Sequence, residues 1–200
     1  MSTLDDSGAI FRYHRDMAAL HGADSSYALG WRSDHDQQIR FVALAKIAPL
    51  NGKTILDAGC GYADLFSYLR DRFAITHYYG VEQIPELVDI AISRYGHLPN
   101  ARFISGSFLS RELPVCDYVF ASGSLNYSSS DPAFIYKAIS KLYNYCSEGL
   151  AFNLLSTVSA PGFLTAYAPE DILAYCRTLS RRVTLDDSYA AEDFTVFMYK

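Results

Sequence analysis

The sequence has few cysteines, and none is spaced for a metal site or a redox pair. The four cysteines stand at positions 60, 116, 146 and 176, so no Cys-x-x-Cys pair occurs. No histidine lies near them at a spacing typical of zinc ligands. We therefore expect reduced, mostly buried thiols, no disulfide framework and no metal site.

Long apolar runs and an excess of positive charge are also missing. No stretch approaches the roughly 20 apolar residues that a membrane-spanning helix needs, and the amino terminus lacks the basic and then apolar pattern of a secretory signal. The chain has 17 Lys and Arg against 22 Asp and Glu, a formal net charge of −5. These absences predict a cytoplasmic protein that binds no membrane, and they disfavour nucleic acid as a partner.

The chain has the length and the apolar content of one folded domain. It has 200 residues, half of them hydrophobic, and no internal repeat or low-complexity stretch. Its aromatic residues are 16 Tyr, 12 Phe and one Trp, more than a core of this size needs. We expect a single domain over residues 1–200 in which some aromatic side chains line a pocket.

From residue 54 onward the hydrophobic pattern alternates between strands and helices. Two helices precede it, one over 9–20 and one that begins near Ser33, where Ser33 and Asp36 resemble a capping box. Strands are expected near 54–57, 77–81, 102–104, 117–121, 149–155, 182–185 and 194–199, and helices over 65–73, 85–95, from 131 and from 169. This order predicts a doubly wound α/β fold: a mostly parallel seven-stranded sheet, helices on both faces and a C-terminal antiparallel hairpin.

A glycine turn follows the first predicted strand. It reads Asp57-Ala58-Gly59-Cys60-Gly61, and a Gly-x-Gly turn lets a ligand approach the backbone closely. Asp57 lies two residues before the first glycine, where a dinucleotide site needs no carboxylate. Asp64 occupies the position of a third glycine, where its charge opposes a pyrophosphate. The turn therefore disfavours a phosphate ligand and allows a cationic one.

A second acid, Glu82, ends the next predicted strand. It lies 21 residues after Gly61, the separation expected when a carboxylate binds the hydroxyls of a ribose. The alternative is that Glu82 only caps the helix opened by Pro85. Its pairing with Asp57 and the two glycines favours a ligand site.

These residues resemble class I S-adenosylmethionine-dependent methyltransferases over about residues 50–200. Asp57-x-Gly59-x-Gly61 matches the first motif of that family, and Glu82 matches its ribose acid. The segments 30–33, 38–41 and 151–156 also resemble a group of small stand-alone bacterial members. The resemblance implies S-adenosyl-L-methionine as cofactor and S-adenosyl-L-homocysteine as product.

The resemblance also implies a set of cofactor contacts. Beside the glycine turn and Glu82, these are Gln83 and Ile84 at the adenine, Ser107 at the place of a frequent aspartate, and Phe108 beside it. Arg32 is a candidate partner of the cofactor's carboxylate and Trp31 of the sulfonium; a surface arginine and a core tryptophan are the alternative. Ser122 and Asn126, in the loop after the fourth strand, would face the transferring methyl, unless this loop is an ordinary polar turn.

The resemblance implies an enzyme that transfers methyl to a small-molecule oxygen or nitrogen nucleophile by in-line displacement. Residues 51–200 would hold the cofactor, and residues 1–50 with the loop 156–168 would cover the acceptor. His14 and Tyr127 are the candidate bases, although a lone histidine often has only a structural role. The alternatives are a non-catalytic S-adenosylmethionine-binding module, an NAD(P)-dependent oxidoreductase and an RNA methyltransferase.

Overall fold

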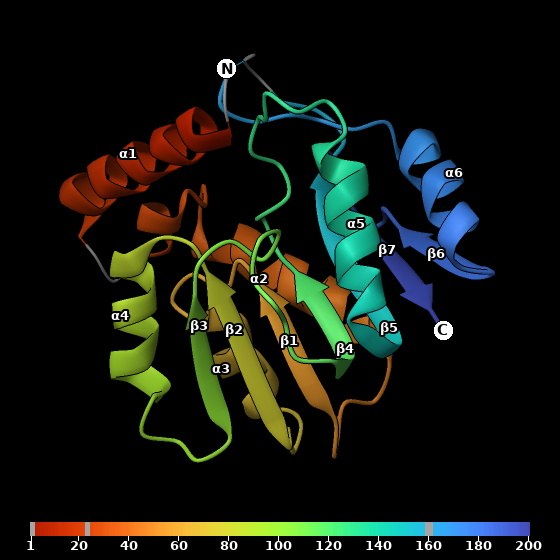
Figure 1. Ribbon diagram of the computed structural model, residues 1–200, viewed down its shortest axis with the longest axis horizontal. Helices are drawn as coiled ribbons and strands as arrows, with labels where there is room; N and C mark the ends of the chain where they lie inside the picture. Colours follow the sequence, from red (N-terminus) through yellow and green to blue (C-terminus); the bar gives the residue numbers. More distant parts are fainter. Residues whose placement is uncertain (1–2, 23–24, 159–161) are drawn as a thin grey trace.

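The computed structural model describes residues 3–22, 25–158 and 162–200, and a seven-stranded sheet forms its centre (Figure 1). The strands are β1 (Thr54–Ala58), β2 (His77–Glu82), β3 (Ala101–Ser105), β4 (Cys116–Ala121), β5 (Cys146–Leu155), β6 (Arg182–Asp186) and β7 (Asp193–Tyr199). The helices are α1 (Thr3–His21), α2 (Asp34–Leu44), α3 (Asp64–Arg70), α4 (Pro85–Tyr95), α5 (Phe134–Asn144) and α6 (Pro169–Leu179), with 3-10 turns η1 (Ser26–Leu29) and η2 (Ala45–Ile47).

The sheet confirms the predicted doubly wound arrangement. Strands β1 to β5 are parallel, and the order along the sheet is β3-β2-β1-β4-β5-β7-β6. Strand β7 runs antiparallel to both β5 and β6, so it lies between them and β6 becomes the edge. Helices α2, α3 and α4 cover one face, and α5 and α6 cover the other (Figure 1).

The central strand β1 builds two buried layers because neighbouring side chains on a strand point to opposite faces. Ile55 belongs to a cluster with Phe41 of α2 and Phe66 of α3, whereas Leu56 belongs to a cluster with Ile139 of α5. Both β1 side chains are fully buried. A short, continuous apolar run is the pattern of such a doubly covered parallel strand.

The predicted bounds of three helices and one strand differ most from those of the structure. Helix α1 begins at Thr3 rather than near residue 9, since no proline interrupts residues 3–9. Helix α3 begins at residue 64 and ends at residue 70 instead of spanning 65–73. Helix α5 begins at Phe134, because Asp131 first forms a turn in which its Oδ1 accepts from the Ala133 N–H at 2.9 Å. Strand β5 begins at Cys146, three residues before the predicted start, where it pairs with the first residue of β4.

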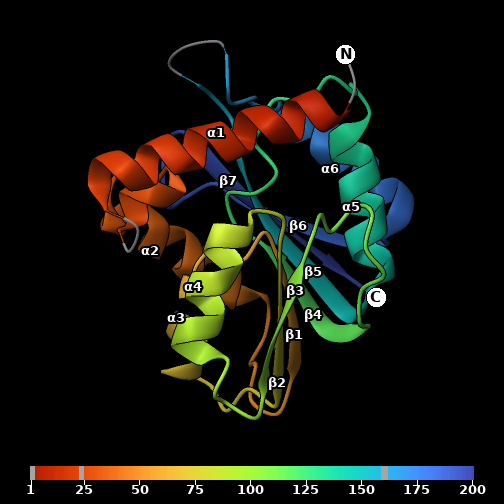
Figure 2. The same cartoon turned by 60° about the vertical axis from the view of Figure 1, so that its left-hand side comes forward.

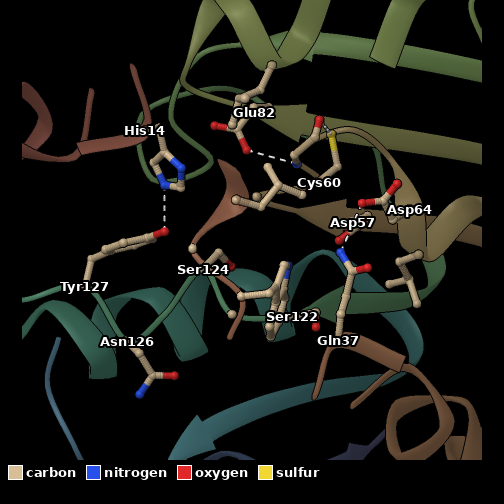
Figure 3. Close-up of a pocket in the computed structure, with 18 of the residues that line it drawn as sticks. His14, Gln37, Asp57, Cys60, Asp64, Glu82, Ser122, Ser124, Asn126 and Tyr127 are labelled. Carbon is tan, nitrogen blue, oxygen red and sulfur yellow. Dashed lines mark hydrogen bonds between the residues drawn. The ribbon is translucent and has the colours of Figure 1, made fainter. Parts of the chain in front are cut away.

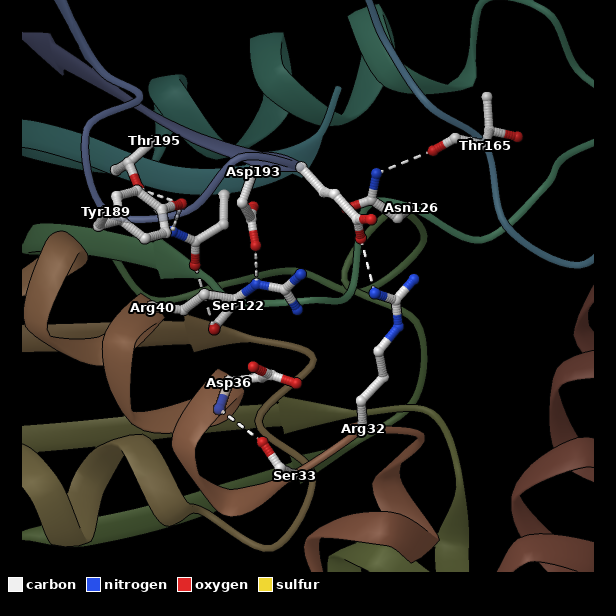
Figure 4. Close-up of polar contacts among 12 residues, drawn as sticks. Arg32, Ser33, Asp36, Arg40, Ser122, Asn126, Thr165, Tyr189, Asp193 and Thr195 are labelled. Carbon is white, nitrogen blue, oxygen red and sulfur yellow. Dashed lines mark hydrogen bonds and ion pairs between the residues drawn. The ribbon is translucent and has the colours of Figure 1, made fainter. Parts of the chain in front are cut away.

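The amino-terminal segment has one predicted and one unpredicted cap. The Oγ of Ser33 accepts from the Asp36 N–H at 3.1 Å and begins α2 as expected (Figure 4). The turn η1 was not predicted; the Oγ of Ser25 accepts from the Ala28 N–H at 3.3 Å, and Gly30 ends the turn with φ +83°. One short turn leaves no helical periodicity in a sequence, so only its capping residues announce it.

Helix α1 covers neither face of the sheet. It lies across the carboxyl ends of the parallel strands and packs on η1 (Figure 2). Ile10 of α1 joins a small apolar cluster with Tyr62 of the glycine turn and Leu87 of α4. This placement puts α1 over the edge of the sheet where ligands of doubly wound folds bind.

All four cysteines are buried and free of disulfide bonds, as the sequence predicts. Of the helices in the described ranges, none combines the length and the apolar character needed to cross a bilayer.

Leu150 of β5 provides a test of the core. Its side chain has 0 % exposure, whereas that of Leu20 on α1 is 74 % exposed. We expect Leu150→Ala to lower the free energy of unfolding by about 2–5 kcal/mol, because it leaves a cavity. The same change at Leu20 should alter it by less than about 0.5 kcal/mol. Urea denaturation measures both, and equal shifts would contradict this packing.

Candidate functional site

A pocket lies at the carboxyl ends of β1, β2 and β4, beneath α1. Its lining joins the ends of these strands to residues of α1, α2 and the segment between them, the usual place of a ligand site in a doubly wound sheet. Figure 3 shows acidic, amide and hydroxyl side chains converging on it from the ends of different strands. The predicted site residues that line it are His14, Trp31, Asp57, Gly59, Cys60, Gly61, Asp64, Glu82, Gln83, Ile84, Phe108, Ser122, Asn126 and Tyr127.

The glycine turn after β1 is packed too closely for side chains. Gly59 has φ +80°, and a Cβ built there would stand 2.3 Å from the Cβ of Ser124. The Oγ of Ser124 donates to the carbonyl oxygen of Ala58 at 2.6 Å. The turn and the loop after β4 therefore form one tightly joined floor to the pocket.

The carboxylate of Glu82 is buried and held by backbone amides. Its Oε2 accepts from the Gly61 N–H at 3.1 Å, and its Oε1 accepts from the Ile84 N–H at 2.9 Å (Figure 3). Burial raises the pKa of Glu82, and these backbone hydrogen bonds oppose the rise. The two bonds fix the plane of the carboxylate where β2 ends beside the glycine turn.

Asp57 is a second buried acid, 2 % exposed, at the end of β1. Its Oδ2 accepts from the hydroxyl of Tyr78 at 2.7 Å. Burial raises the pKa of Asp57 to about 7, the charges of Glu82 and Asp64 add to the rise, and the Tyr78 hydrogen bond opposes it. A cation in the pocket would favour the ionised form of this carboxyl.

Asp64 lines the pocket from the first turn of α3, but its charge is shared with neighbours. Its Oδ1 pairs with the guanidinium of Arg94 at 2.9 Å, and its Oδ2 accepts from the Nε2 of Gln37 at 3.0 Å. The negative charge that the sequence places beside the glycine turn is thus partly neutralised by α4.

Two predicted cofactor contacts lie elsewhere. Arg32 pairs with Glu192 at 2.6 Å on the surface (Figure 4), and it does not line the pocket. Ser107 is also outside the lining; its Oγ accepts from the Leu109 N–H at 3.2 Å within its own turn. In both cases the polar side chain bonds to another residue of the fold that lies outside the pocket lining.

Arg40 lines the pocket in a position that the sequence did not assign to it. Its Nε donates to Asp193 at the start of β7 (Figure 4), and its guanidinium lies 4.7 Å from the ring centre of Trp31. Gln37, also missed, lies three residues earlier on the same side of α2. That spacing is the only signal in the sequence, because Asp193 is 153 positions away.

Two polar residues of the loop after β4 form hydrogen bonds to β5 and to the loop that follows β5. The Oγ of Ser122 donates to Asn153 at 3.2 Å, and the Nδ2 of Asn126 donates to the carbonyl oxygen of Thr165 at 2.9 Å.

The thiol of Cys60 is buried, which raises its pKa and keeps it neutral. No cluster of three or more metal-ligating side chains occurs within the ranges that the structure describes.

The candidate bases His14 and Tyr127 meet at the wall of the pocket. The Nε2 of His14 lies 2.7 Å from the hydroxyl oxygen of Tyr127 (Figure 3), and its Nδ1 lies 3.0 Å from the carbonyl oxygen of Ala28. Burial lowers the pKa of His14, and the bond to Ala28 opposes that shift. Burial raises the pKa of Tyr127. Both groups are therefore neutral near pH 7.

The pKa of Asp57 links folding stability to pH. A carboxyl with a pKa of about 7 in the folded state and an ordinary pKa when unfolded holds an extra proton in the folded state between these values. Stability from this group is then complete below about pH 4 and lost as the pH rises through about 7, on the order of 1 kcal/mol per pH unit. We expect Asp57→Asn to remove this slope. Urea midpoints across the range measure it, with exposed Asp89→Asn as control; parallel curves for Asp57→Asn and the parent would contradict the assignment.

Comparisons of the sequence with known proteins point to one family. A family model described as a methyltransferase domain matches residues 55–149. The protein named "Putative methyltransferase Rv1506c" from Mycobacterium tuberculosis (strain ATCC 25618 / H37Rv) is 33% identical over 157 residues, which cover 74% of this chain and 93% of that protein.

Solved structures share the fold. Magnesium protoporphyrin IX methyltransferase (ChlM) from Synechocystis PCC 6803 with bound SAH superposes with a TM-score of 0.65 at 17% identity, over 83% of each chain. The Burkholderia thailandensis 1,6-didemethyltoxoflavin-N1-methyltransferase, with that compound and S-adenosylhomocysteine bound, superposes with a TM-score of 0.67 at 13% identity, over 100% of this chain and 91% of that one. The family model and the sequence relative agree with the glycine turn, with the acid that ends β2 and with the sheet topology. This chain belongs to the class I S-adenosylmethionine-dependent methyltransferases.

Proposed function

We propose that this chain binds S-adenosylmethionine in the pocket and transfers its methyl group to an oxygen or nitrogen atom of a small molecule. The observation that carries the proposal is the Glu82 carboxylate, oriented by the amides of Gly61 and Ile84 at the end of β2. A carboxylate in this position can accept from both hydroxyls of an unphosphorylated ribose.

The floor of the pocket fits a cationic nucleoside better than a dinucleotide. Gly59 and Gly61 line it and adopt positive φ angles of +80° and +53°, which give the turn its tight course beneath a ligand. The buried acids Asp57 and Glu82 favour a positive charge and oppose a pyrophosphate. This charge distribution, like the family membership, counts against the NAD(P)-dependent oxidoreductase alternative.

Other lining residues would hold the remaining parts of the cofactor. Gln83, Ile84 and Phe108 line the pocket beyond Glu82 and would pack on the adenine. Arg40 lines it near Trp31, and its guanidinium suits a carboxylate. We assign Arg40 the contact with the cofactor's carboxylate, in place of Arg32.

The residues of this chain would position the reaction rather than supply its electrophile. The bound cofactor carries a methyl group activated by a positively charged sulfur. The protein would hold an acceptor in line with that methyl and exclude water. Ile10, Leu29 and Trp31 line the pocket from the amino-terminal segment, so we assign residues 1–50 the cover and residues 51–200 the cofactor site.

The loop 156–168 was also expected to cover the acceptor. Leu164 lines the pocket, which supports that expectation for the part of the loop that the structure describes. Residues 159–161, with Pro161, lie outside the described residues.

A small molecule is the acceptor that the pocket favours. Apolar side chains of the amino-terminal segment and of Leu164 line the pocket opposite the strand ends, which suits a small ligand. Two of the similar proteins are named for small organic compounds, magnesium protoporphyrin IX and 1,6-didemethyltoxoflavin. The net charge of −5 gives no electrostatic attraction to RNA, which leaves an RNA methyltransferase as the weaker alternative.

Removal of the ribose acid tests the cofactor site. We expect Glu82→Ala and Asp57→Ala each to weaken binding of S-adenosylhomocysteine by roughly 1–3 kcal/mol, because each removes a charged hydrogen-bond acceptor. Titration calorimetry measures the affinity. Arg32→Ala and the exposed Asp89→Ala are matched controls that should bind like the parent. Parental affinity in both acid variants would place the cofactor elsewhere.

Methyl transfer itself tests the acceptor class. With isotope-labelled S-adenosylmethionine, we expect label to pass to members of a panel of small phenols, acids and amines, and not to total RNA or protein. The pocket is the reason, since it admits a compact ligand beside the cofactor. Transfer only to RNA or protein would refute the small-molecule proposal. Binding of the cofactor with no transfer to any acceptor, cell extract included, would favour the non-catalytic module.

A further inference from the structure

The tautomer of His14 is fixed by the fold. Its Nδ1 lies 3.0 Å from the carbonyl oxygen of Ala28 in η1. A carbonyl oxygen only accepts hydrogen bonds, so Nδ1 carries the hydrogen of the neutral ring. The Nε2 then has a free lone pair, and it accepts from the hydroxyl of Tyr127 at 2.7 Å. His14 therefore presents a base, not a donor, to Tyr127.

Tyr127 is held rigidly in its loop. It forms an antiparallel bridge with Leu164, and the neighbouring Ser128 N–H donates to the carbonyl oxygen of Phe163 at 2.9 Å. The ring of Phe163 packs edge-on against the ring of Tyr127, with centroids 5.1 Å apart. Because the hydroxyl hydrogen is directed to His14, the oxygen of Tyr127 keeps lone pairs for a further donor.

Much of the surroundings of the pair is apolar. Ile10, Leu29, Ile84 and Leu87 belong to the same apolar cluster as Tyr127, and Leu164 pairs with Tyr127. Such a compartment favours an uncharged, largely apolar ligand.

Within the described ranges, Tyr13 and Glu82 are the titratable groups that act on the pair from outside it. The ring of Tyr13, on the same helix as His14, lies 5.2 Å from the His14 ring. Glu82, at the end of β2, raises the pKa of Tyr127 by its charge. Neither group holds a hydrogen bond to the pair that would compete with the contact between Tyr127 and His14.

We propose that Tyr127 and His14 form a proton relay that accepts the hydroxyl proton of a phenol-like methyl acceptor. This inference rests on the proposed methyltransferase function and names the substrate class of the same site. Tyr127 touches the acceptor and is the catalytic residue of the pair, and His14 acts through it. An apolar aromatic alcohol fits the walls, and its weakly acidic hydroxyl is the group that needs a base.

The transfer balances in protons and electrons. The acceptor hydroxyl gives its proton to the oxygen of Tyr127, while the proton of Tyr127 passes to the Nε2 of His14. A lone pair of the acceptor oxygen forms the new bond to the methyl carbon. The carbon–sulfur bond breaks, and its electron pair goes to sulfur. One positive charge leaves sulfur and one appears on the imidazole, which later returns its proton to water.

The pairing also explains which acceptors would gain little from this site. A carboxylate is already ionised and needs no base. Burial of a carboxylate among the apolar side chains would cost desolvation free energy, and the neutral His14 and Tyr127 would supply no opposite charge. The relay is useful only to an acceptor that arrives with its proton.

Ionisation of a bound phenol tests the relay without turnover. The probe is 4-nitrophenol, whose anion absorbs visible light. It is added to the full chain with sinefungin, an S-adenosylmethionine analogue with an amine in place of the sulfonium and no transferable methyl. An apolar pocket alone raises the pKa of a bound phenol. We expect the relay to oppose this rise, so that the anion band of the bound probe appears at a lower pH in the parent than in a chain without the relay.

Three variants separate the relay from packing. Tyr127→Phe keeps the ring contact with Phe163 and removes only the oxygen, and His14→Gln removes the base. Both should bind 4-nitrophenol and show its anion band only at a higher pH than the parent does. Tyr13→Phe is the matched control, because Tyr13 also packs on Phe163 but does not line the pocket. It should keep the anion band of the parent.

The outcomes separate this inference from the function on which it rests. Failure of sinefungin to bind, measured by calorimetry, contradicts the proposed function itself. Sinefungin binding without any uptake of 4-nitrophenol refutes the phenol-like acceptor. An anion band with the same pH dependence in the parent, Tyr127→Phe and His14→Gln refutes the relay while the cofactor site stands.

Discussion

The hydrogen bond that the Glu82 carboxylate receives from the Gly61 N–H joins the carboxyl ends of the neighbouring strands β1 and β2 at the pocket, and the Ile84 N–H satisfies its other oxygen. A buried carboxylate is costly unless its oxygens are satisfied. Here the partners exist only because β1 and β2 run parallel in register, with Ala58 beside Val81. The Val81 carbonyl oxygen accepts from the amides of Gly59 and Cys60 at 2.8 and 3.1 Å. The acid, the turn and the strand pairing thus depend on one another.

The close approach at Gly59 extends this dependence to the acceptor side of the pocket. Because no Cβ intervenes, Ser124 can donate to the carbonyl oxygen of Ala58. That bond brings the loop after β4 against the glycine turn. Tyr127, three residues further along the loop, then reaches His14 on α1. The absence of a side chain at Gly59 therefore also helps to position Tyr127, the residue proposed to contact the acceptor.

Local patterns carry most of the fold, and long-range pairings carry what the sequence leaves undetermined. The order of strands and helices, the C-terminal hairpin and the Ser33 cap depend on periodicity and on neighbours in the chain, and these predictions are confirmed. The positions of the Arg32 and Arg40 side chains depend on their partners Glu192 and Asp193, which lie 160 and 153 positions away along the chain. Nothing local distinguishes which arginine pairs at the surface and which lines the pocket. The meeting of His14 and Tyr127 spans 113 positions and is hidden for the same reason.

The position of the chain's single tryptophan has a practical consequence. Trp31 lines the pocket, lies under the guanidinium of Arg40 and stands so near Gly123 that a Cβ there would approach its ring to 2.9 Å. Indole emission depends on the polarity and the charges around the ring. Because no second tryptophan contributes, all indole emission of the chain comes from the wall of the pocket. A change in Trp31 emission therefore reports the binding of a ligand in the pocket.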